Sequence, residues 1–382
     1  MPTGLRAGAQ VYSPLYTLAF LRPMDTGPLH LLYRADGGNA LGTGHLLRAV
    51  RVLAAIAELA PLDAVMAVSE DPSGIAYAQR ANVPLLMLPA RRLHGPKPRF
   101  DPRDLASRAR LDAYDAVVVD MLDTEAGALA EVSKLGPKVI TLDDRGAGRL
   151  GADAIVNFLV REPDPERLSA GTRLWEGPEY ATLDPAFEAE PPPRREPDAG
   201  HARVLVSVGG GDAAGLSLKI ARALTDVRGI SEATFVTGSA FASARELERL
   251  TRRGTWRGRM AMDLPNLRDE LLSCDLAIVA GGMTLHEACC AGAPALAVCQ
   301  PIDHQIELAR RFEEAGAMRS LGDGTQVSEA EIADAARALL ADREGLRRMS
   351  EMGPRIVDGR GTSRTASAII EAARGIHIGG TR

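Results

Sequence analysis

The stretch GGNALGTGHLLRAVRVLAAIAEL, residues 37–59, joins a glycine-rich loop to a long segment with helical periodicity. It follows LHLLYRAD, residues 29–36, an apolar run that is typical of a buried strand. Glycines let a backbone turn tightly and approach a ligand closely, and the start of a helix offers unpaired amides and partial positive charge. The stretch therefore predicts the opening strand–loop–helix unit of a parallel α/β sheet.

The second half of the chain repeats this order in ARVLVSVGGGDAAGLSLKIARALTDV, residues 202–227. Continuous Val/Leu/Ile runs that alternate with helical patterns indicate parallel sheets covered on both faces. Further runs of this kind occupy residues 63–69, 84–89, 114–121, 138–144, 233–238, 275–282, 293–299 and 317–322. We expect two Rossmann-like domains whose sheets face a cleft, with ligands bound beyond the carboxyl ends of the strands.

A proline-rich segment, FEAEPPPRREPDAGHA, marks the boundary between the two halves and is typical of an extended linker. We place an N-terminal domain at residues 29–187, the linker at 188–201 and a C-terminal domain at 202–382. The last helix of the C-terminal domain is expected to cross back to the first domain. Residues 1–28 form an N-terminal extension that we assign to neither domain.

The composition excludes several classes of protein. The 382 residues are 46% hydrophobic and 25% charged, with a formal net charge of −5 and no basic run of the kind that binds nucleic acid. No apolar run approaches the roughly 20 residues that span a bilayer, and the N-terminal extension lacks the basic start of a signal peptide. The cysteines, at positions 274, 289, 290 and 299, have no metal-binding spacing. We expect a cytoplasmic protein without an integral membrane segment.

The first candidate site lies where the opening loop becomes a helix. His45 follows Gly42 and Gly44 and falls in the first turn of the predicted helix, at the carboxyl end of a strand. An imidazole there can take a proton from water or from a hydroxyl near pH 7. We predict that His45 is catalytic and that the two glycines contact substrate, although a purely structural histidine is an alternative.

The second candidate site is the glycine loop that opens the other domain. Gly209, Gly210 and Gly211 follow a strand and precede a helix, an arrangement that can bind a diphosphate through backbone amides. Asp212, which comes next, is a candidate cap for that helix.

The third candidate site lies in VAGGMTLHEACCAGAPALAVCQPIDHQ, residues 279–305. Glu287 either accepts the two hydroxyls of a ribose or closes a capping box with Thr284. His304 and Gln305 begin a further helix, and His304 is a second candidate catalytic residue. The residues of this stretch that we expect to bind substrate are Gly281, Gly282, Met283, Thr284, Glu287 and Gln305.

Three aspartates at strand ends of the first half raise the question of a metal. Asp120, Asp143 and Asp144 include a carboxylate pair, but no third ligand accompanies them. Such residues also cap helices or accept hydrogen bonds from loop amides. We expect neither a metal nor another cofactor.

A set of motifs resembles the UDP-sugar hydrolase family of the pseudaminic acid pathway and related spore-coat polysaccharide proteins. The resemblance covers about residues 30–370, and its Gly-Gly…Glu part is shared with a wider glycosyltransferase group that includes the lipid-linked UDP-GlcNAc transferase of murein synthesis. The motifs, in their common order, are YRADGGNALGTGHLLRAV, VITLDDRGAGRLGADAIVN, EGPEYATLDPAF, VSVGGGDAAGLSLKIARAL, AGGMTLHEACCAGAPALAV and IVDGRGTSR.

The resemblance implies a GT-B architecture that binds a UDP-linked amino sugar without a metal. It implies that His45 acts on an attacking water and that Glu287 holds the uridine ribose. Arg34, Asp36 and Arg48 also match the family pattern, and Arg34 is expected at the sugar or phosphate end of the substrate.

Two positions depart from the hydrolase pattern, which has tyrosine where this chain has Leu122 and asparagine where it has His304. We predict that the enzyme cleaves the anomeric bond of a UDP-linked amino sugar by base-assisted attack of water, releasing UDP. The alternative is a glycosyltransferase that moves the sugar to a glycan or lipid acceptor in surface polysaccharide biosynthesis. A third alternative is a nucleotide-sugar-binding protein without catalysis. An apolar and basic segment at residues 90–100 is a candidate lip for a lipid acceptor or a solvated loop.

Overall fold

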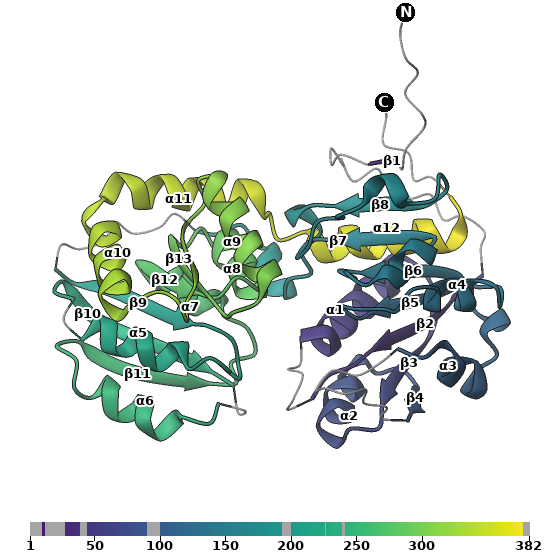
Figure 1. The fold of residues 1–382 in the computed structure, drawn as a ribbon, viewed down its shortest axis with the longest axis horizontal. Coiled ribbons are helices and arrows are strands. Elements are labelled where there is room, and N and C mark those ends of the chain that lie inside the picture. The colour runs from purple at the N-terminus through teal and green to yellow at the C-terminus, as the bar shows by residue number, and fades with distance from the viewer. Residues whose placement is uncertain are drawn as a thin grey trace, which may run out of the picture. The chain divides into compact units, whose positions relative to one another are not determined.

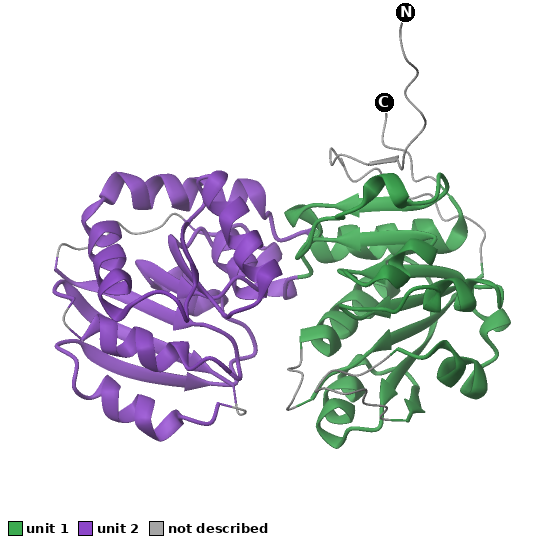
Figure 2. Cartoon of the chain, in the orientation of Figure 1, with its two compact units in different colours: residues 1–182, 361–382 green, residues 183–360 purple. Residues whose placement is uncertain are grey.

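The computed structural model describes residues 10–11, 27–38, 44–89, 100–192, 200–225, 227–238 and 241–376. The chain divides into two compact units, which Figure 2 colours separately. Unit 1 comprises residues 1–182 and 361–382, and unit 2 comprises residues 183–360. Each unit is built on its own parallel sheet with helices on both faces (Figure 1), so the predicted α/β class is confirmed.

The sheet of unit 1 has the strand order β1-β8-β7-β6-β5-β2-β3-β4 within the described part of the chain. From β2 the chain adds β3 and β4 on one side, then crosses to β5 on the other side and continues outward to β8. The carboxyl ends of β2 and β5 therefore border the point where the strand order reverses, which is where open α/β sheets bind ligands. The strands are β1 Gln10–Val11, β2 Leu29–Ala35, β3 Leu62–Ser69, β4 Leu85–Leu88, β5 Ala116–Asp120, β6 Lys138–Leu142, β7 Ala154–Asn157 and β8 Arg173–Glu176.

The helices of unit 1 include one that lies far from the others in the sequence. α12 packs against α1 and contacts β6 and β7, so the last helix covers the same sheet as the first (Figure 1). The α-helices are α1 Gly44–Leu59, α2 Pro72–Ala78, α3 Pro102–Arg108, α4 Ala128–Ser133 and α12 Gly361–Arg374. The 3₁₀ segments are Gln79–Ala81, Leu111–Ala113, Ala147–Gly151, Pro165–Arg167 and Pro178–Tyr180.

The start of α12 explains the Gly-Thr-Ser-Arg motif that the sequence singles out. A Cβ on Gly361 would lie 2.2 Å from the carbonyl oxygen of Ala181, so only glycine fits at this contact. One turn later, Thr365 donates from its hydroxyl to the Tyr180 carbonyl at 2.9 Å, and Arg364 donates to the Glu179 carbonyl at 3.0 Å. These bonds fix the helix against the segment at 179–181.

Unit 2 repeats the topology of unit 1. Its strands lie in the order β11-β10-β9-β12-β13-β14, and the order reverses between β9 and β12. The strands are β9 Ala202–Ser207, β10 Ile230–Thr237, β11 Arg257–Met262, β12 Leu276–Val279, β13 Ala295–Cys299 and β14 Arg319–Asp323. The helices are α5 Leu216–Leu224, α6 Ala244–Thr251, α7 Arg268–Ser273, α8 Met283–Cys290, α9 Asp303–Glu314, α10 Glu329–Ala341 and α11 Arg343–Ile356, with a 3₁₀ turn at Pro185–Glu188.

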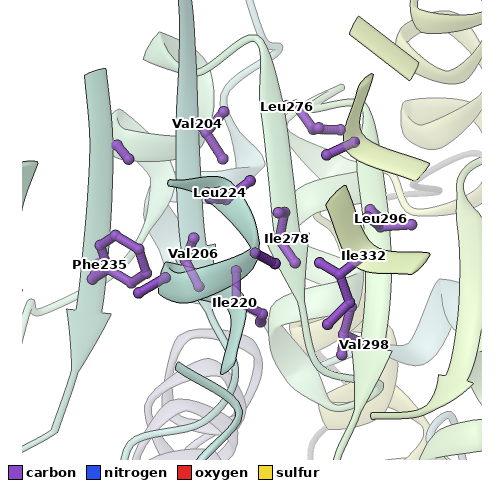
Figure 3. Packing of buried hydrophobic residues seen from close by; sticks show 14 of the residues in the cluster. Val204, Val206, Ile220, Leu224, Phe235, Leu276, Ile278, Leu296, Val298 and Ile332 are labelled. Atoms are coloured by element: carbon purple, nitrogen blue, oxygen red, sulfur yellow. The ribbon is translucent and has the colours of Figure 1, made fainter. Parts of the chain in front are cut away.

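The core of unit 2 is aliphatic, as expected for a chain in which only 4% of residues are aromatic. Val206 and Ile278 point from adjacent strands toward Ile220 of α5, and Ile332 of α10 joins them (Figure 3). Phe235 adds one ring from the neighbouring strand β10. Burial of this face supplies the main stabilisation of the sheet, at about 25 cal/mol for each square ångström of apolar surface removed from water.

The boundaries of the units differ from those placed by sequence. Unit 1 ends at Thr182, whereas the sequence analysis ends its first domain at residue 187. Phe187 is buried in unit 2, where its carbonyl oxygen accepts a hydrogen bond from Cys290 Sγ at 3.5 Å. A Cβ on Gly359 would lie only 2.1 Å from the same carbonyl oxygen. The close packing of residues 183–187 therefore joins them to unit 2. Of the expected linker, residues 193–199 lie outside the described residues, as does most of the N-terminal extension.

Four strands of the described residues escaped the sequence analysis, namely β1, which has two residues and pairs with β8, and β7, β8 and β11. β7 and β8 have only four residues each, and β11 carries arginines at both its first and third positions, so none presents a long apolar run. Among the described residues, none of the helices combines the length and the apolar character needed to cross a membrane.

Candidate functional site

The site in unit 1 is built on one turn of α1 and the end of β5. His45 and Arg48 are three residues apart on α1 and therefore share a face of the helix. Asp120 is the last residue of β5, the strand next to β2 at the reversal of the strand order. His45 Nδ1 lies 2.5 Å from Asp120 Oδ1, and Arg48 Nε donates to Asp120 Oδ2 at 2.7 Å. Arg48 Nη2 also donates to Asp120 Oδ1, so the carboxylate is bound through both oxygens.

The charges of this group decide where the imidazole proton lies. Although burial raises the pKa of Asp120, the charges of Arg48 and His45 outweigh it and lower the pKa to about 2. Asp120 is thus an ionised carboxylate, which only accepts hydrogen bonds. His45 Nδ1 must carry the proton, and the Arg48 Nη2 at 3.0 Å from Nδ1 is a close neighbour rather than a donor to it. The Nε2 lone pair is left available, on a side chain that is 24% exposed.

Two further side chains complete the buried group. Tyr33 of β2 donates from its hydroxyl to Asp120 Oδ2 at 3.0 Å. Burial, together with the charge of Asp120, raises the pKa of Tyr33 well above its usual value, so the phenol keeps its proton. On the other side, Arg48 Nη1 donates to Asp143 Oδ2 at 2.5 Å, and the ring of Phe158 lies 5.2 Å from the guanidinium carbon.

Asp143 sits in a strained turn directly after β6. Its φ of 52° lies in the left-handed region, which is uncommon for residues other than glycine. Asp143 Oδ1 accepts hydrogen bonds from the amides of Phe158 and Leu159, both at 2.8 Å, and from that of Val160 at 3.4 Å. Burial raises the pKa of Asp143, with Arg48 and these amides acting against it. Asp143 thus accepts loop amides, one of the roles expected from sequence.

Arg34 and Asp36 form a separate buried pair. Arg34 donates to both carboxylate oxygens of Asp36, at 2.6 Å and 2.5 Å, and to the Ala35 carbonyl at 2.9 Å. Asp36 also accepts the Ser69 amide at 2.9 Å. Arg34 is only 3% exposed, and these contacts join the ends of β2 and β3. Its expected contact with substrate stays a prediction.

The remaining predicted residues of unit 1 have simpler surroundings. Gly44 is exposed as the first residue of α1, whereas Gly42 lies outside the described residues, as do residues 90–99 of the candidate lip. Asp144 accepts the Thr124 and Gly146 amides at 3.0 Å and 2.8 Å and thereby joins the loops after β5 and β6. Among the described residues, no group of three or more His, Cys, Asp or Glu side chains is arranged to hold a metal ion.

In unit 2, the glycine loop 209–211 is exposed but its helix is already capped. Asp212 accepts the Leu216 amide through Oδ1 at 2.8 Å and the Ser217 amide through Oδ2 at 2.7 Å, which is the capping role considered from sequence. Gln300, after β13, donates to Asp212 Oδ1 at 2.9 Å and to the Val208 carbonyl at 3.0 Å. Sequence reasoning missed Gln300, because its contacts depend on β13 lying near β9 in the sheet.

The start of α8 lies close to the start of α9, and the N-cap residue of neither helix supplies a side-chain cap. The N-cap residues are Gly282 and Ile302, and neither helix start receives a hydrogen bond from the side chain of its cap. A Cβ on Gly281 would lie 2.1 Å from the Gln305 carbonyl oxygen, so glycine permits the two segments to touch. Two helix N-termini at one place favour an anion, because their amides and dipoles carry partial positive charge.

This arrangement corrects one reading of Glu287. α8 begins at Met283 with Gly282 as N-cap, so Thr284 lies inside the helix and forms no capping box with Glu287. Glu287 is 8% exposed in the middle of α8. Met283 and Thr284 are half-buried in the first turn of α8, and His304 is the second residue of α9.

The chain matches no protein-family model. It is 26% identical over 349 residues to the spore coat polysaccharide biosynthesis protein SpsG of Bacillus subtilis. The match covers 89% of this chain and 98% of SpsG. The crystal structure of Acinetobacter baumannii MurG matches with a TM-score of 0.64 and 17% identity, over 90% of this chain and 100% of that one. Anabaena HepE, solved in complex with UDP and glucose, matches with a TM-score of 0.56 and 13% identity, over 91% and 100%.

The fold is GT-B. Its structural neighbours include glycosyltransferases of this two-domain, Rossmann-like architecture, which is the fold that the sequence predicted. Structural similarity at sequence identities this low establishes the fold. The chemistry depends on the side chains of the site.

The contact between α8 and α9 gives a test of the second unit. We expect Gly281→Ala to lower the free energy of unfolding by about 1–3 kcal/mol, because the new methyl group overlaps the Gln305 carbonyl. Gly282→Ala is the control, since its nearest neighbour is Gln305 Nε2 at 3.8 Å, and it should cost less than about 1 kcal/mol. Urea unfolding measures both values. Equal losses would contradict the close approach.

Proposed function

We propose that this protein is a glycosyltransferase that takes a sugar from a UDP donor and transfers it to a hydroxyl of an acceptor. The observation that carries the proposal is the His45–Asp120 pair at the reversal of strand order in unit 1. The GT-B fold and the similarity to a spore coat polysaccharide biosynthesis protein support it. The acceptor class we propose is a glycan or a lipid-linked saccharide of a surface polysaccharide.

Unit 1 supplies the base in this proposal. Asp120 holds the proton on Nδ1 of His45, so Nε2 takes the proton of the attacking hydroxyl while its oxygen bonds to the anomeric carbon. The imidazolium that forms is stabilised by the Asp120 carboxylate. Asp120 is buried and bound by Arg48 and Tyr33, so it is held in place beside His45 before the reaction begins.

Unit 2 supplies the site for the leaving UDP. The bond from the anomeric carbon to the phosphate oxygen breaks, and negative charge grows on the diphosphate. The N-cap residues of α8 and α9, Gly282 and Ile302, supply no side-chain cap, and the amides at these helix starts suit this charge. The start of α5 is less suited, because Asp212 already binds its Leu216 and Ser217 amides. We assign the ribose to Glu287 and the diphosphate to Gly282, Met283 and Thr284.

Hydrolysis of the UDP-sugar is the second candidate function. The His45 side chain is 24% exposed, so water reaches the same ring that an acceptor hydroxyl would use. The two reactions share the donor, the base and the leaving group and differ only in the nucleophile. Products therefore distinguish them better than residues do.

The test is a panel of UDP-sugars incubated with the protein, with and without saccharide acceptors, with UDP and free sugar measured separately. We expect UDP release that depends on the acceptor and is reduced about 10²–10⁴-fold in His45→Asn, the usual loss on removing a general base. His30→Asn is the matched control, because His30 lies near the opposite end of β2, where it contacts Asp63. UDP and free sugar in equal amounts without acceptor would support the hydrolase instead.

His304 is the rival base, and His304→Asn is measured in parallel. We expect His304→Asn to keep a rate well above that of His45→Asn, because His45 has the carboxylate partner Asp120. If His304→Asn abolishes turnover and His45→Asn does not, the base belongs to unit 2 and the assignment of His45 is wrong.

The role of Glu287 is tested by binding alone. We expect Glu287→Ala to weaken UDP binding by about 1.5–3 kcal/mol, the range for hydrogen bonds to a charged group. Isothermal titration calorimetry with UDP measures the change. Glu270→Ala, on the neighbouring α7 and paired with Arg259, is the control and should leave the affinity unchanged. Unaltered affinity in Glu287→Ala would leave this carboxylate with a structural role only.

A further inference from the structure

Among the described residues, three buried charged side chains are linked to His45, so their charges do not cancel. Asp120 and Asp143 are both fully buried, and the guanidinium that lies between them belongs to Arg48, which is 5% exposed. Two carboxylates and one guanidinium leave one net negative charge. A proton on His45 neutralises it, because the imidazolium is the fourth charge of the group.

We propose that Asp143 and Arg48 are positioning residues. Together they set the net charge of the buried group beside His45, and this charge affects how readily His45 takes up a proton. Asp143 reaches His45 only through Arg48, which binds Asp143 with Nη1 and Asp120 with Nε and Nη2. This inference deepens the proposed function and rests on it for the catalytic use of His45, but the charge relation itself is measurable in the absence of any reaction.

The contacts of Asp143 fit an ionised carboxylate. The four hydrogen bonds that Asp143 makes within the described residues are all donated to it, three by backbone amides and one by the guanidinium, as expected for a carboxylate without a proton. The amides belong to residues 158–160, directly after β7, so a different loop holds Asp143 in place. The Phe158 ring lies over Arg48 and keeps water from that side of the guanidinium.

Within the described residues, the charged and titratable groups that reach His45 directly or through one hydrogen-bonded neighbour come from several elements. They are Arg48 on its own helix, Asp120 at the end of β5, Tyr33 on β2 through Asp120, and Asp143 after β6 through Arg48. Tyr33 donates a hydrogen bond and carries no charge. Because Asp143, Arg48 and Asp120 are buried, water screens the charge of Asp143 on His45 less than it screens a surface charge.

The expected sign follows from the charges. Asp143→Asn removes one negative charge and leaves the buried group neutral before His45 takes a proton. Protonation of His45 then creates a net positive charge, so it requires more acidic conditions. We expect the midpoint of the His45 titration to fall by about one pH unit, the size of a charge interaction across several ångströms of protein interior.

The experiment is an NMR titration of the histidine ring carbons in the full chain without substrate, with the His45 signal assigned by its loss in His45→Asn. Asp144→Asn is the matched control. Asp144 is the neighbouring buried carboxylate and accepts amides of Thr124 and Gly146. It should move the midpoint by less than about 0.3 pH units. Asp143→Glu keeps the charge and should restore the wild-type midpoint to within the same margin.

A downward shift in Asp143→Asn that is absent in Asp144→Asn supports the proposal. No shift, an upward shift, or equal shifts in both variants would overturn it. If Asp143→Asn does not fold, Asp143→Ser replaces it, because serine keeps an oxygen for the loop amides and the same shift is expected. This outcome is separate from that of the proposed function. If Asp143→Asn shifts the midpoint but the protein turns over no UDP-sugar, Asp143 still influences protonation of His45, while the proposed catalytic use of His45 fails.

Discussion

The site in unit 1 depends on one guanidinium that is shared by two buried carboxylates. Arg48 binds Asp120 at the end of β5 and Asp143 after β6, and it thereby fixes α1 over the carboxyl ends of both strands. Breaking such a buried pair leaves an unpaired charge, which typically costs about 3–5 kcal/mol. The position of His45, one turn before Arg48 on the same helix, follows from this constraint.

The two units use the same topology for different purposes. The strand order reverses beside β2 in unit 1 and beside β9 in unit 2, and a glycine-containing loop leads from each of these strands into a helix. In unit 1 the helix start presents an imidazole. In unit 2 the corresponding helix start is closed by Asp212 and Gln300, and the open helix starts belong to α8 and α9. This difference suits unit 1 to proton transfer and unit 2 to binding an anion.

Much of the fold could be predicted from the sequence, because long apolar runs and glycine loops are local signals. The opening strand, glycine loop and helix were predicted in this order, and His45 was placed correctly in the first turn of the helix. The partners of His45 were harder to predict from the sequence. Asp120 lies 75 positions away and contacts His45 only because β5 pairs with β2. Tyr33 was not considered at all, because a tyrosine inside an apolar strand gives no sign that its hydroxyl faces a carboxylate. The order of the strands in the sheet decides these contacts, and the periodicity of the sequence does not reveal that order.

The protonation state of the two His45 ring nitrogens tests the role of this side chain directly. In neutral imidazole, ¹⁵N chemical shifts distinguish a nitrogen that carries a proton from one with a free lone pair. For the neutral ring we predict a proton on Nδ1, held by Asp120 at 2.5 Å, and a free lone pair on Nε2. Asp120→Asn should weaken this preference. A proton on Nε2 in the wild-type protein would contradict the assignment of His45 as the base, because the nitrogen that faces solvent would then have no lone pair to accept a proton.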